Sequence, residues 1–410
     1  MLAPYTGTWT RGEAAHLLWR TQSGAGTGEV DRVLSDGLEV TVGRLVTPQA
    51  EGEEFLATES VLSQSARSSR SIGALKNWWF YRMLHTANPL AEKMVLFWHN
   101  HFATSNRKVR SAQHMAVQNQ LIREHCLGRF DRLLGGMARD VAMLKWLDSN
   151  ANRKRQPNEN FAREVMELFT LGVGNYTEHD IKEAARAFSG WHLRNEKFWL
   201  NRGQHDGGTK TVFGRSGEFG GEDILRLCLA HEACPRLLAG KLLKTFVSPN
   251  PDIPTTEALA ASIRGHAFDM ARVMAELLCS EAFFAPAARR SLIKSPAELV
   301  LGSYRALGVR AKLPQSVQLM ADLGQSLFEP PTVKGWEGGR LWINATSMLQ
   351  RTNFAAELVA GDRYGRLPKP RRGTDYTRLL LGEAADIQPP GRDPLGKIQF
   401  ILSTPEYQML

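Results

Sequence analysis

Residues 157–172, Pro-Asn-Glu-Asn-Phe-Ala-Arg-Glu-Val-Met-Glu-Leu-Phe-Thr-Leu-Gly, carry the clearest helical pattern in this chain of 410 residues. On a helix of about 100° per residue, the apolar side chains form a wide arc and the polar ones share the remaining side. The arc contains Phe161, Ala162, Val165, Met166, Leu168 and Phe169, and the polar side contains Asn160, Arg163, Glu164 and Glu167. So wide an arc predicts a helix buried on most sides, whose polar side faces either solvent or a walled site.

The same stretch contains residues of opposite charge at helical spacing and glycines that are expected to end the helix. Glu159, Arg163 and Glu167 follow one another at four-residue spacing, which makes opposite charges neighbours on a helix. Gly172 and Gly174 are expected to end the helix, because glycine is the usual residue just past a helix C-terminus. The carboxylates fit two interpretations: an ion-pair lattice centred on Arg163, and a site for proton transfer or metal binding.

Beyond this helix, the composition is that of an ordinary soluble globular protein, with 43% hydrophobic and 23% charged residues. No stretch approaches about 18 uninterrupted apolar residues, so no transmembrane helix is expected. Residues 1–20 lack the basic and then apolar order of a secretory signal. The expected location of the chain as given, unless a presequence was removed, is the cytoplasm.

The charge is distinctly basic, with a formal net charge of +9 and a pI near 9.5. Such a balance permits nucleic acid, an anionic polymer or a membrane surface as a partner, but a solvated arginine-rich surface is the simpler explanation. The local clusters, none long enough to indicate nucleic-acid binding by itself, are residues 107–110, 153–155 and 369–372.

The four cysteines indicate neither a zinc site nor a disulfide scaffold. They contain no pair at the C-x-x-C spacing of structural zinc ligands, and four thiols are few for a chain of this length. We interpret them as buried thiols: Cys126, Cys228, Cys234 and Cys279.

Helical periodicity along most of the chain predicts a mainly α protein with one large domain over residues 1–360, of which 1–70 form an N-terminal helical extension. One small antiparallel hairpin is expected at about 191–214, with strands at 191–200 and 209–214 and a turn at 203–208. Residues 361–393, rich in proline, glycine and charge, predict a linker, and 394–410 a closing helix.

A second helix, after Asn88-Pro89, carries two histidines. Asn88 is expected to cap it, and Glu92 and His99 fall on nearly the same side, whereas His101 lies on the opposite side and cannot join His99 in chelating one ion. Glu92 with His99 fits a metal pair or an oriented histidine base. The alternative is a core histidine hydrogen-bonded to the backbone or to that glutamate.

Two loops supply further candidates. His205-Asp206 lies on the glycine-containing turn 203–208, so both groups could reach a cleft, although a local Asx-turn with a surface histidine explains the pair as well. On the proline- and glycine-rich loop 330–339, Lys334 could meet an anion and Trp336 could stack on a sugar or base. The alternative for Trp336 is a side chain that fills the core.

Several long motifs resemble a bacterial family, the domain-of-unknown-function family numbered 1800. The matching stretches are residues 92–102, 157–164, 185–191, 205–206, 324–325, 330–336 and 405–408, in that order along nearly the whole chain. The resemblance implies no activity. It implies that many relatives are exported and accompany a sulfatase-like partner, and this chain departs from that pattern because it begins without a signal.

The combined expectation is a hydrolase or transferase acting on a glycan or another polyhydroxyl or anionic substrate. The expected catalytic residues are His99, Glu164, Glu167, His205 and Asp206, and the expected substrate-binding residues are Asn160, Arg163, Lys334 and Trp336. A divalent metal held by His99, Glu164 and His205 is a further expectation. Two alternatives stay open: a non-catalytic scaffold or maturation partner that binds a sulfatase-like protein, and a nucleic-acid-binding protein.

Overall fold

A computed structural model describes residues 2–361, 363–370, 373–382 and 387–410. Within these residues the protein is mainly α-helical with three small antiparallel strand pairs, which confirms the predicted fold class. The first ten helices are α1 (Arg11–Gln22), α2 (Thr27–Asp36), α3 (Leu38–Val46), α4 (Glu53–Ser69), α5 (Ile72–His85), α6 (Pro89–His101), α7 (Asn106–Val109), α8 (Ala112–His125), α9 (Phe130–Met137) and α10 (Val141–Trp146).

The remaining helices fall into two groups, one before and one after residue 290. The first group is α11 (Asn160–Glu164), α12 (Glu178–Phe188), α13 (Gly221–Ala230), α14 (Ala233–Phe246), α15 (Ile253–Gly265), α16 (Met270–Leu278) and α17 (Glu281–Phe284). The second is α18 (Pro296–Leu307), α19 (Leu313–Asp322), α20 (Ala345–Ala360), α21 (Tyr376–Leu381) and α22 (Pro394–Ser403). The strands are β1 (Trp191–Arg194), β2 (Lys197–Leu200), β3 (Lys210–Val212), β4 (Arg215–Gly217), β5 (Arg310–Ala311) and β6 (Gly365–Arg366).

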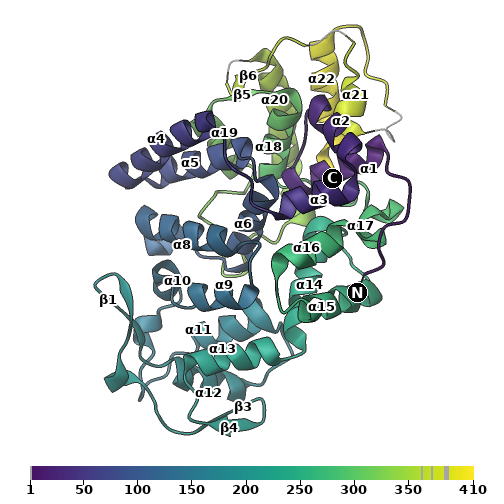
Figure 1. Ribbon diagram of the computed structural model, residues 1–410. Helices are drawn as coiled ribbons and strands as arrows, with labels where there is room; N and C mark the ends of the chain where they lie inside the picture. The colour runs from purple at the N-terminus through teal and green to yellow at the C-terminus, as the bar shows by residue number, and fades with distance from the viewer. Residues whose placement is uncertain (1, 362, 371–372, 383–386) are drawn as a thin grey trace.

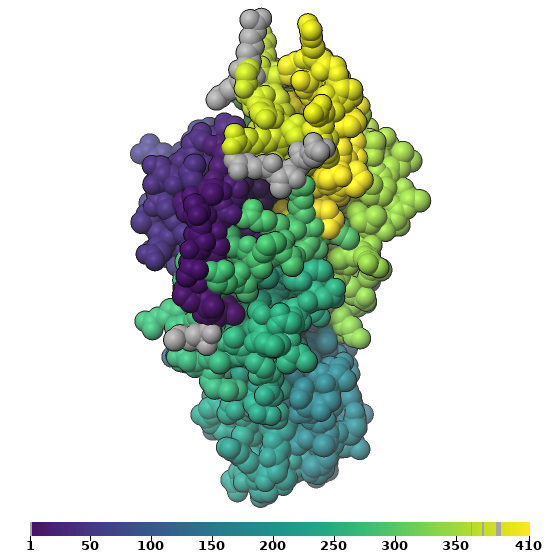
Figure 2. All heavy atoms as spheres, turned by 90° about the vertical axis from the view of Figure 1, so that its right-hand side faces the viewer, coloured from purple at the N-terminus to yellow at the C-terminus, as the bar shows by residue number. Residues whose placement is uncertain are grey.

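Segments from both ends of the chain lie together in the upper part of the molecule. Figure 1 shows α1–α5 there beside α18–α22, whereas α9–α13 form the lower part and α6 lies centrally. Helix α6 packs against α1, α3, α5 and α8, so it joins the two parts. Figure 2 shows the first residues running along the helices near residue 280, where the Tyr5 N–H donates to the Cys279 carbonyl at 2.8 Å.

The aromatic residues of α5 and α6 form the centre of the core. Trp79, Trp98 and Phe102 are fully buried, because each helix carries apolar residues on nearly every side. The ring of Trp98 stacks on Phe130 of α9 at 5.3 Å, and its indole N–H donates to the Cys126 carbonyl at 2.8 Å. A buried tryptophan thus keeps its one polar group paired.

The inserted β structure differs from the single predicted hairpin. Strand β1 turns back onto β2 at Asn195 and Glu196, and β3 turns back onto β4 at Phe213 and Gly214. Asn195 and Glu196 both adopt positive φ, 50° and 56°, which is the backbone conformation of a tight two-residue turn. The predicted pairing across residues 203–208 therefore does not form, since residues 191–200 already pair with themselves.

Residues 130–146 form two helices, α9 and α10, and the Asp140 carboxylate caps α10 by accepting from the Met143 N–H at 2.9 Å. Two further features differ from the sequence-based expectations. Asn88 precedes α6, but its side-chain oxygen accepts from the Gln49 N–H at 2.6 Å and does not cap the helix. The expected linker 361–393 contains the helix α21.

Candidate functional site

The stretch 157–172 folds as a short α-helix that widens into a π-helix. Helix α11 ends at Glu164, and Val165–Thr170 continues with π geometry. The N–H groups of Leu171 and Gly172 both donate to the Met166 carbonyl, at 2.8 and 3.2 Å, and Gly172 has a φ of 82°. The predicted glycine stop is confirmed. The wide turn was not foreseen, and such turns occur frequently at functional sites.

A half-buried lysine and a buried histidine hold the end of the π-helix. Lys241 of α14 donates to the Leu168 carbonyl at 2.8 Å and contacts His101 Nδ1 at 2.9 Å. His101 Nε2 lies 3.1 Å from the Phe169 carbonyl, so this nitrogen carries the proton. Burial lowers the pKa of Lys241 to about 8, and the charge of Lys244 adds to the effect. Sequence reasoning missed Lys241, although a lysine within the apolar pattern of α14 was its signal.

Arg163 is the centre of an ion-pair lattice. Its guanidinium lies 3.0 Å from Glu159 and 2.8 Å from Glu178, and these hydrogen bonds raise its pKa. The predicted pairing of Arg163 with Glu159 therefore forms, whereas Glu167 is not a partner. Because its donors are occupied, Arg163 fits the lattice interpretation better than substrate binding. Asn160, at the start of the helix, presents an exposed side chain.

Glu164 and Glu167 have different surroundings although they lie on one helix. Glu167 accepts a hydrogen bond from the Tyr176 hydroxyl at 2.8 Å. Glu164 is half-buried and has no hydrogen-bond or ion-pair partner among the described residues. Burial raises the pKa of Glu164, and the charge of Glu167 raises it further, against the opposing charges of Arg163 and Lys334. One carboxyl is therefore held by a donor, and the other retains its proton to a higher pH.

The loop 330–339 is fastened to α6 by one asparagine. Asn100 accepts from the Trp336 N–H at 2.7 Å and donates to the Trp336 carbonyl at 3.2 Å. A side chain at Gly335, whose φ is 82°, would place its Cβ 2.2 Å from Asn100 Oδ1, so only glycine fits there. This fastening turns Trp336 inward, where it is 6% exposed, and leaves Lys334 exposed. The predicted stacking of Trp336 on a ligand is thus replaced by packing in the core.

His99 is enclosed by aromatic rings. It is 1% exposed, and its ring centre lies 5.4 Å from that of Trp79, 5.6 Å from Phe328 and 5.7 Å from Trp336. Its Nε2 has no hydrogen-bond partner in the part of the chain that the structure describes, and burial lowers its pKa to about 3, so the ring is neutral. These surroundings match the core-histidine alternative and provide no route for a substrate to reach the ring.

Glu92 does not pair with His99. Its carboxylate binds Arg123 at 2.6 Å, Arg82 at 3.1 Å and the Trp79 indole N–H at 3.0 Å. Burial by itself would raise the pKa of Glu92, but the two arginines outweigh it and the pKa is lowered. Glu92 is the buried anion that joins α5, α6 and α8.

His205 and Asp206 fix a loop to α12. Asp206 forms an ion pair with Arg186 at 2.9 Å and accepts from the Gly208 N–H at 2.9 Å, as in an Asx-turn. The hydrogen bond from Arg186 lowers the pKa of Asp206. His205 Nδ1 lies 2.9 Å from the Ser189 carbonyl. Both residues have structural partners, and in the described part of the chain neither forms a hydrogen bond or an ion pair with Glu164.

The expected metal ligands are not assembled. Across the described ranges, no group of three or more His, Cys, Asp or Glu side chains is arranged to hold a metal ion. His99 is enclosed by aromatic rings, and His205 contacts the Ser189 carbonyl at the end of α12. Neither histidine is therefore placed to share a metal ion with Glu164. The structure does bring together Glu164, Glu167 and Lys334, which we call the Glu164 face.

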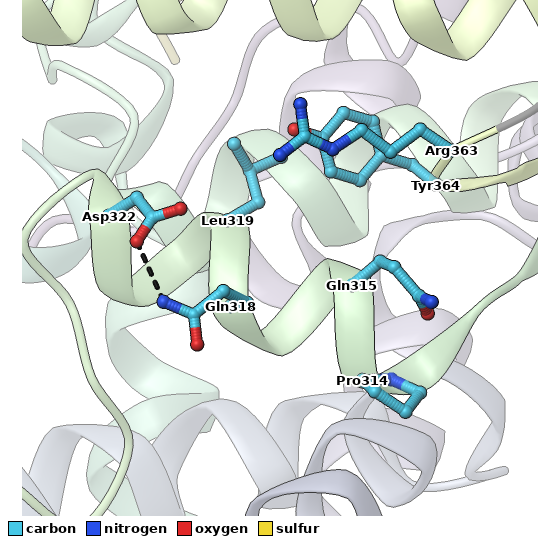
Figure 3. A pocket seen from close by; sticks show the side chains of 7 residues that line it. All are labelled: Pro314, Gln315, Gln318, Leu319, Asp322, Arg363 and Tyr364. Carbon is cyan, nitrogen blue, oxygen red and sulfur yellow. Dashed lines mark hydrogen bonds between the residues drawn. The ribbon is translucent and has the colours of Figure 1, made fainter.

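Two hollows of the surface lie away from the candidate residues. One, of about 200 Å³, lies along α19, where Gln318 donates to Asp322 at 2.7 Å and the Arg363 guanidinium lies 5.2 Å from the centre of the Tyr364 ring (Figure 3). A second lies where Leu2 and Ala3 meet Pro254. No candidate residue lines either of these two hollows.

Comparison with known proteins identifies one family. A sequence model described as "Protein of unknown function (DUF1800)" matches residues 16–409. No curated protein and no solved structure matches the chain. None of the helices in the part of the chain that the structure describes has the length and apolar character needed to cross a membrane.

Proposed function

The chain belongs to the DUF1800 family, whose description names no function, so we propose one from its own residues: an acid–base hydrolase or transferase acting at the Glu164 face. The observation that carries this proposal is the unpaired, half-buried carboxyl of Glu164 beside Glu167. A substrate with hydroxyl or anionic groups suits the face, because Lys334 is exposed and has no ion-pair partner among the described residues.

The two carboxyl groups suit different steps of one reaction. The charge of Glu167 acts on Glu164, so the two carboxyl groups lie near each other and both can approach one bond. Glu164, with its raised pKa, would donate a proton to the leaving oxygen. Glu167, oriented by Tyr176, would accept a proton from water or from an acceptor hydroxyl. Glycoside cleavage uses such a pair of carboxyl groups with separated roles.

The test is a turnover assay on purified protein. Release of reducing ends would be measured on neutral and anionic polysaccharides, for the wild type, Glu164→Gln and the matched control Glu124→Gln. Glu124 is an exposed glutamate of α8 whose hydrogen-bond donor among the described residues is Gln120. We expect Glu164→Gln to lower kcat by about 10²-fold or more and the control to retain it. Equal turnover by wild type and Glu164→Gln contradicts the proposal, and no turnover on any polymer favours the scaffold alternative.

A further inference from the structure

The hairpin formed by β1 and β2 gathers positive charge on one face. In its register Arg194 lies opposite Lys197, and His192 lies opposite Trp199, so these four side chains share a face. Like charges directly opposite each other destabilise a strand pair. Figure 1 shows this hairpin at the margin of the molecule, beside α10. The pairing of two cations, Arg194 and Lys197, weakens the hairpin locally, and such an unfavourable pairing at an exposed position indicates a functional constraint.

A second basic segment lies against the same hairpin. The Lys154 N–H donates to the Gln204 carbonyl at 2.8 Å, and His192 Nε2 lies 3.0 Å from the Asn152 carbonyl. The basic loop 153–155 therefore lies beside the base of the β1–β2 hairpin and beside the segment after β2, which carries Arg202. We call this surface the basic hairpin patch: residues 153–155, Arg194, Lys197, Trp199 and Arg202.

The cations of this patch are available to a ligand. All six are exposed, and none forms an ion pair within the described ranges. The acid nearest in sequence, Glu196, is engaged elsewhere, at 2.6 Å from Lys145 and 2.9 Å from His114. Six uncompensated charges on segments about 40 residues apart create a local field that attracts a polyanion.

Trp199 adds an aromatic surface to the charged one. It is 38% exposed, and the guanidinium carbon of Arg194 lies 5.2 Å from its ring centre. An exposed tryptophan held by an arginine offers a flat apolar surface next to cations. This combination suits a chain whose units have both a stacking face and a negative charge.

We infer that the basic hairpin patch binds an acidic polysaccharide. Proteins that bind single-stranded nucleic acid use a series of aromatic side chains, one for each of several bases. Among the described residues of this patch, Trp199 is the one exposed large aromatic, whereas the cations are several. One stacking position among many charges fits a sugar chain bearing sulfate or carboxylate groups better than it fits a nucleic acid.

The location of the patch connects it with the Glu164 face, and this part of the inference rests on the proposed function. The Asn158 N–H donates to Asn152 Oδ1 at 3.1 Å, so the basic loop runs directly into α11. Arg155 precedes Glu164 by nine residues, which bounds their separation at about 30 Å. One extended polymer bound at the patch can therefore reach Glu164 and Lys334, which identifies an acidic polysaccharide as the substrate class.

The inference is tested by binding rather than by turnover. The affinity of the full chain for dextran sulfate, neutral dextran and a 30-nucleotide oligothymidylate would be measured over a range of salt. The patch variant is Arg194→Gln with Lys197→Gln and Arg202→Gln. The control is Arg32→Gln with Arg67→Gln and Arg264→Gln, which removes three exposed, unpaired arginines elsewhere. A Trp199→Ala variant separates stacking from charge.

We expect dextran sulfate to bind most tightly and its affinity to weaken as salt rises. The patch variant should lose about tenfold or more of this affinity at low salt and show a shallower salt dependence, with the control near wild type. Trp199→Ala should weaken binding without changing the salt dependence. Because binding is measured without turnover, this result stands whether or not the proposed chemistry at Glu164 is correct.

Three results would overturn the inference. Equal losses in the patch and control variants would show that net charge alone binds the polymer. Binding of neutral dextran as tight as that of dextran sulfate would exclude a role for the cations. Tighter binding of oligothymidylate, weakened by Trp199→Ala, would instead identify the patch as a nucleic-acid surface.

Discussion

Tyr176 donates a hydrogen bond of 2.8 Å to Glu167, and Glu164, three residues earlier on the same helix, has no such donor among the described residues. This difference assigns distinct chemistry to two residues that are identical in type. Replacing Tyr176 by Phe removes the hydroxyl and keeps the ring. We expect kcat to fall about tenfold, because Glu167 loses its orientation, and the free energy of unfolding to fall by about 1 kcal/mol.

Steady-state kinetics and urea unfolding of Tyr176→Phe check this prediction. The half-buried ring keeps its packing, so a loss of several kcal/mol would show that Tyr176 supports the fold rather than the site. Unchanged kcat would show that Glu167 needs no orientation.

Replacing His99 by Phe should leave stability unchanged or raise it. The Nε2 atom is buried without a hydrogen-bond partner, and such an atom costs about 1–3 kcal/mol that an apolar ring does not. Turnover should persist, because His99 is enclosed by Trp79, Phe328 and Trp336. A variant that folds as well as wild type but loses turnover would restore His99 to the catalytic set.

Replacing Gly335 by Ala should destabilise the protein by about 2 kcal/mol or more, because the new Cβ meets Asn100 and the φ is positive. Gly43 in α3 is the matched control, since an added Cβ there meets nothing within 4 Å. Gly43→Ala should be neutral or stabilising. Chemical unfolding gives the free energy of unfolding of both variants. Equal values for Gly335→Ala and Gly43→Ala would contradict the described fastening of the loop by Asn100.

Asp140 makes stability depend on pH. Burial raises its pKa to about 6, against hydrogen bonds that include the Met143 N–H and the Gln118 amide. A group with a raised pKa in the folded state stabilises the fold fully below its unfolded pKa and loses that contribution as pH rises through its folded pKa. Relative to Asp140→Asn, the free energy of unfolding of the wild type should therefore fall by about 2 kcal/mol between pH 4 and pH 7. Parallel stability curves for the two proteins would contradict the raised pKa.

Sequence patterns were sufficient for the features that depend on near neighbours. The helical class, the ion pair of Arg163 with Glu159 and the stop at Gly172 follow from spacing and residue type. The capping box of Thr177 and Asp180 forms as its pattern predicts. The Glu164 face was also foreseen in part, because Glu164 and Glu167 share the polar side of one helix.

Features that depend on contacts between residues far apart in the sequence could not be predicted from local patterns. Trp336 turns inward because Asn100, 236 residues away in sequence, binds its backbone. Lys241 and His101 contact the last carbonyl groups of the π-helix, and no local sequence pattern predicts either contact. His99 lies in the core because the loop from Phe328 to Trp336 covers it, so periodicity within α6 could not distinguish a buried side from an open site.

The measurement that tests the central claim most directly is the pH dependence of kcat/KM for Lys334→Gln beside wild type, on any polymer that the enzyme turns over. If Glu164 is the general acid, kcat/KM falls as pH rises through its raised pKa. Lys334 lowers that pKa, so its removal should shift the fall to higher pH, and Glu164→Gln should lack both the activity and the fall. A fall at the same pH in wild type and Lys334→Gln would contradict the assignment of Glu164 as the acid.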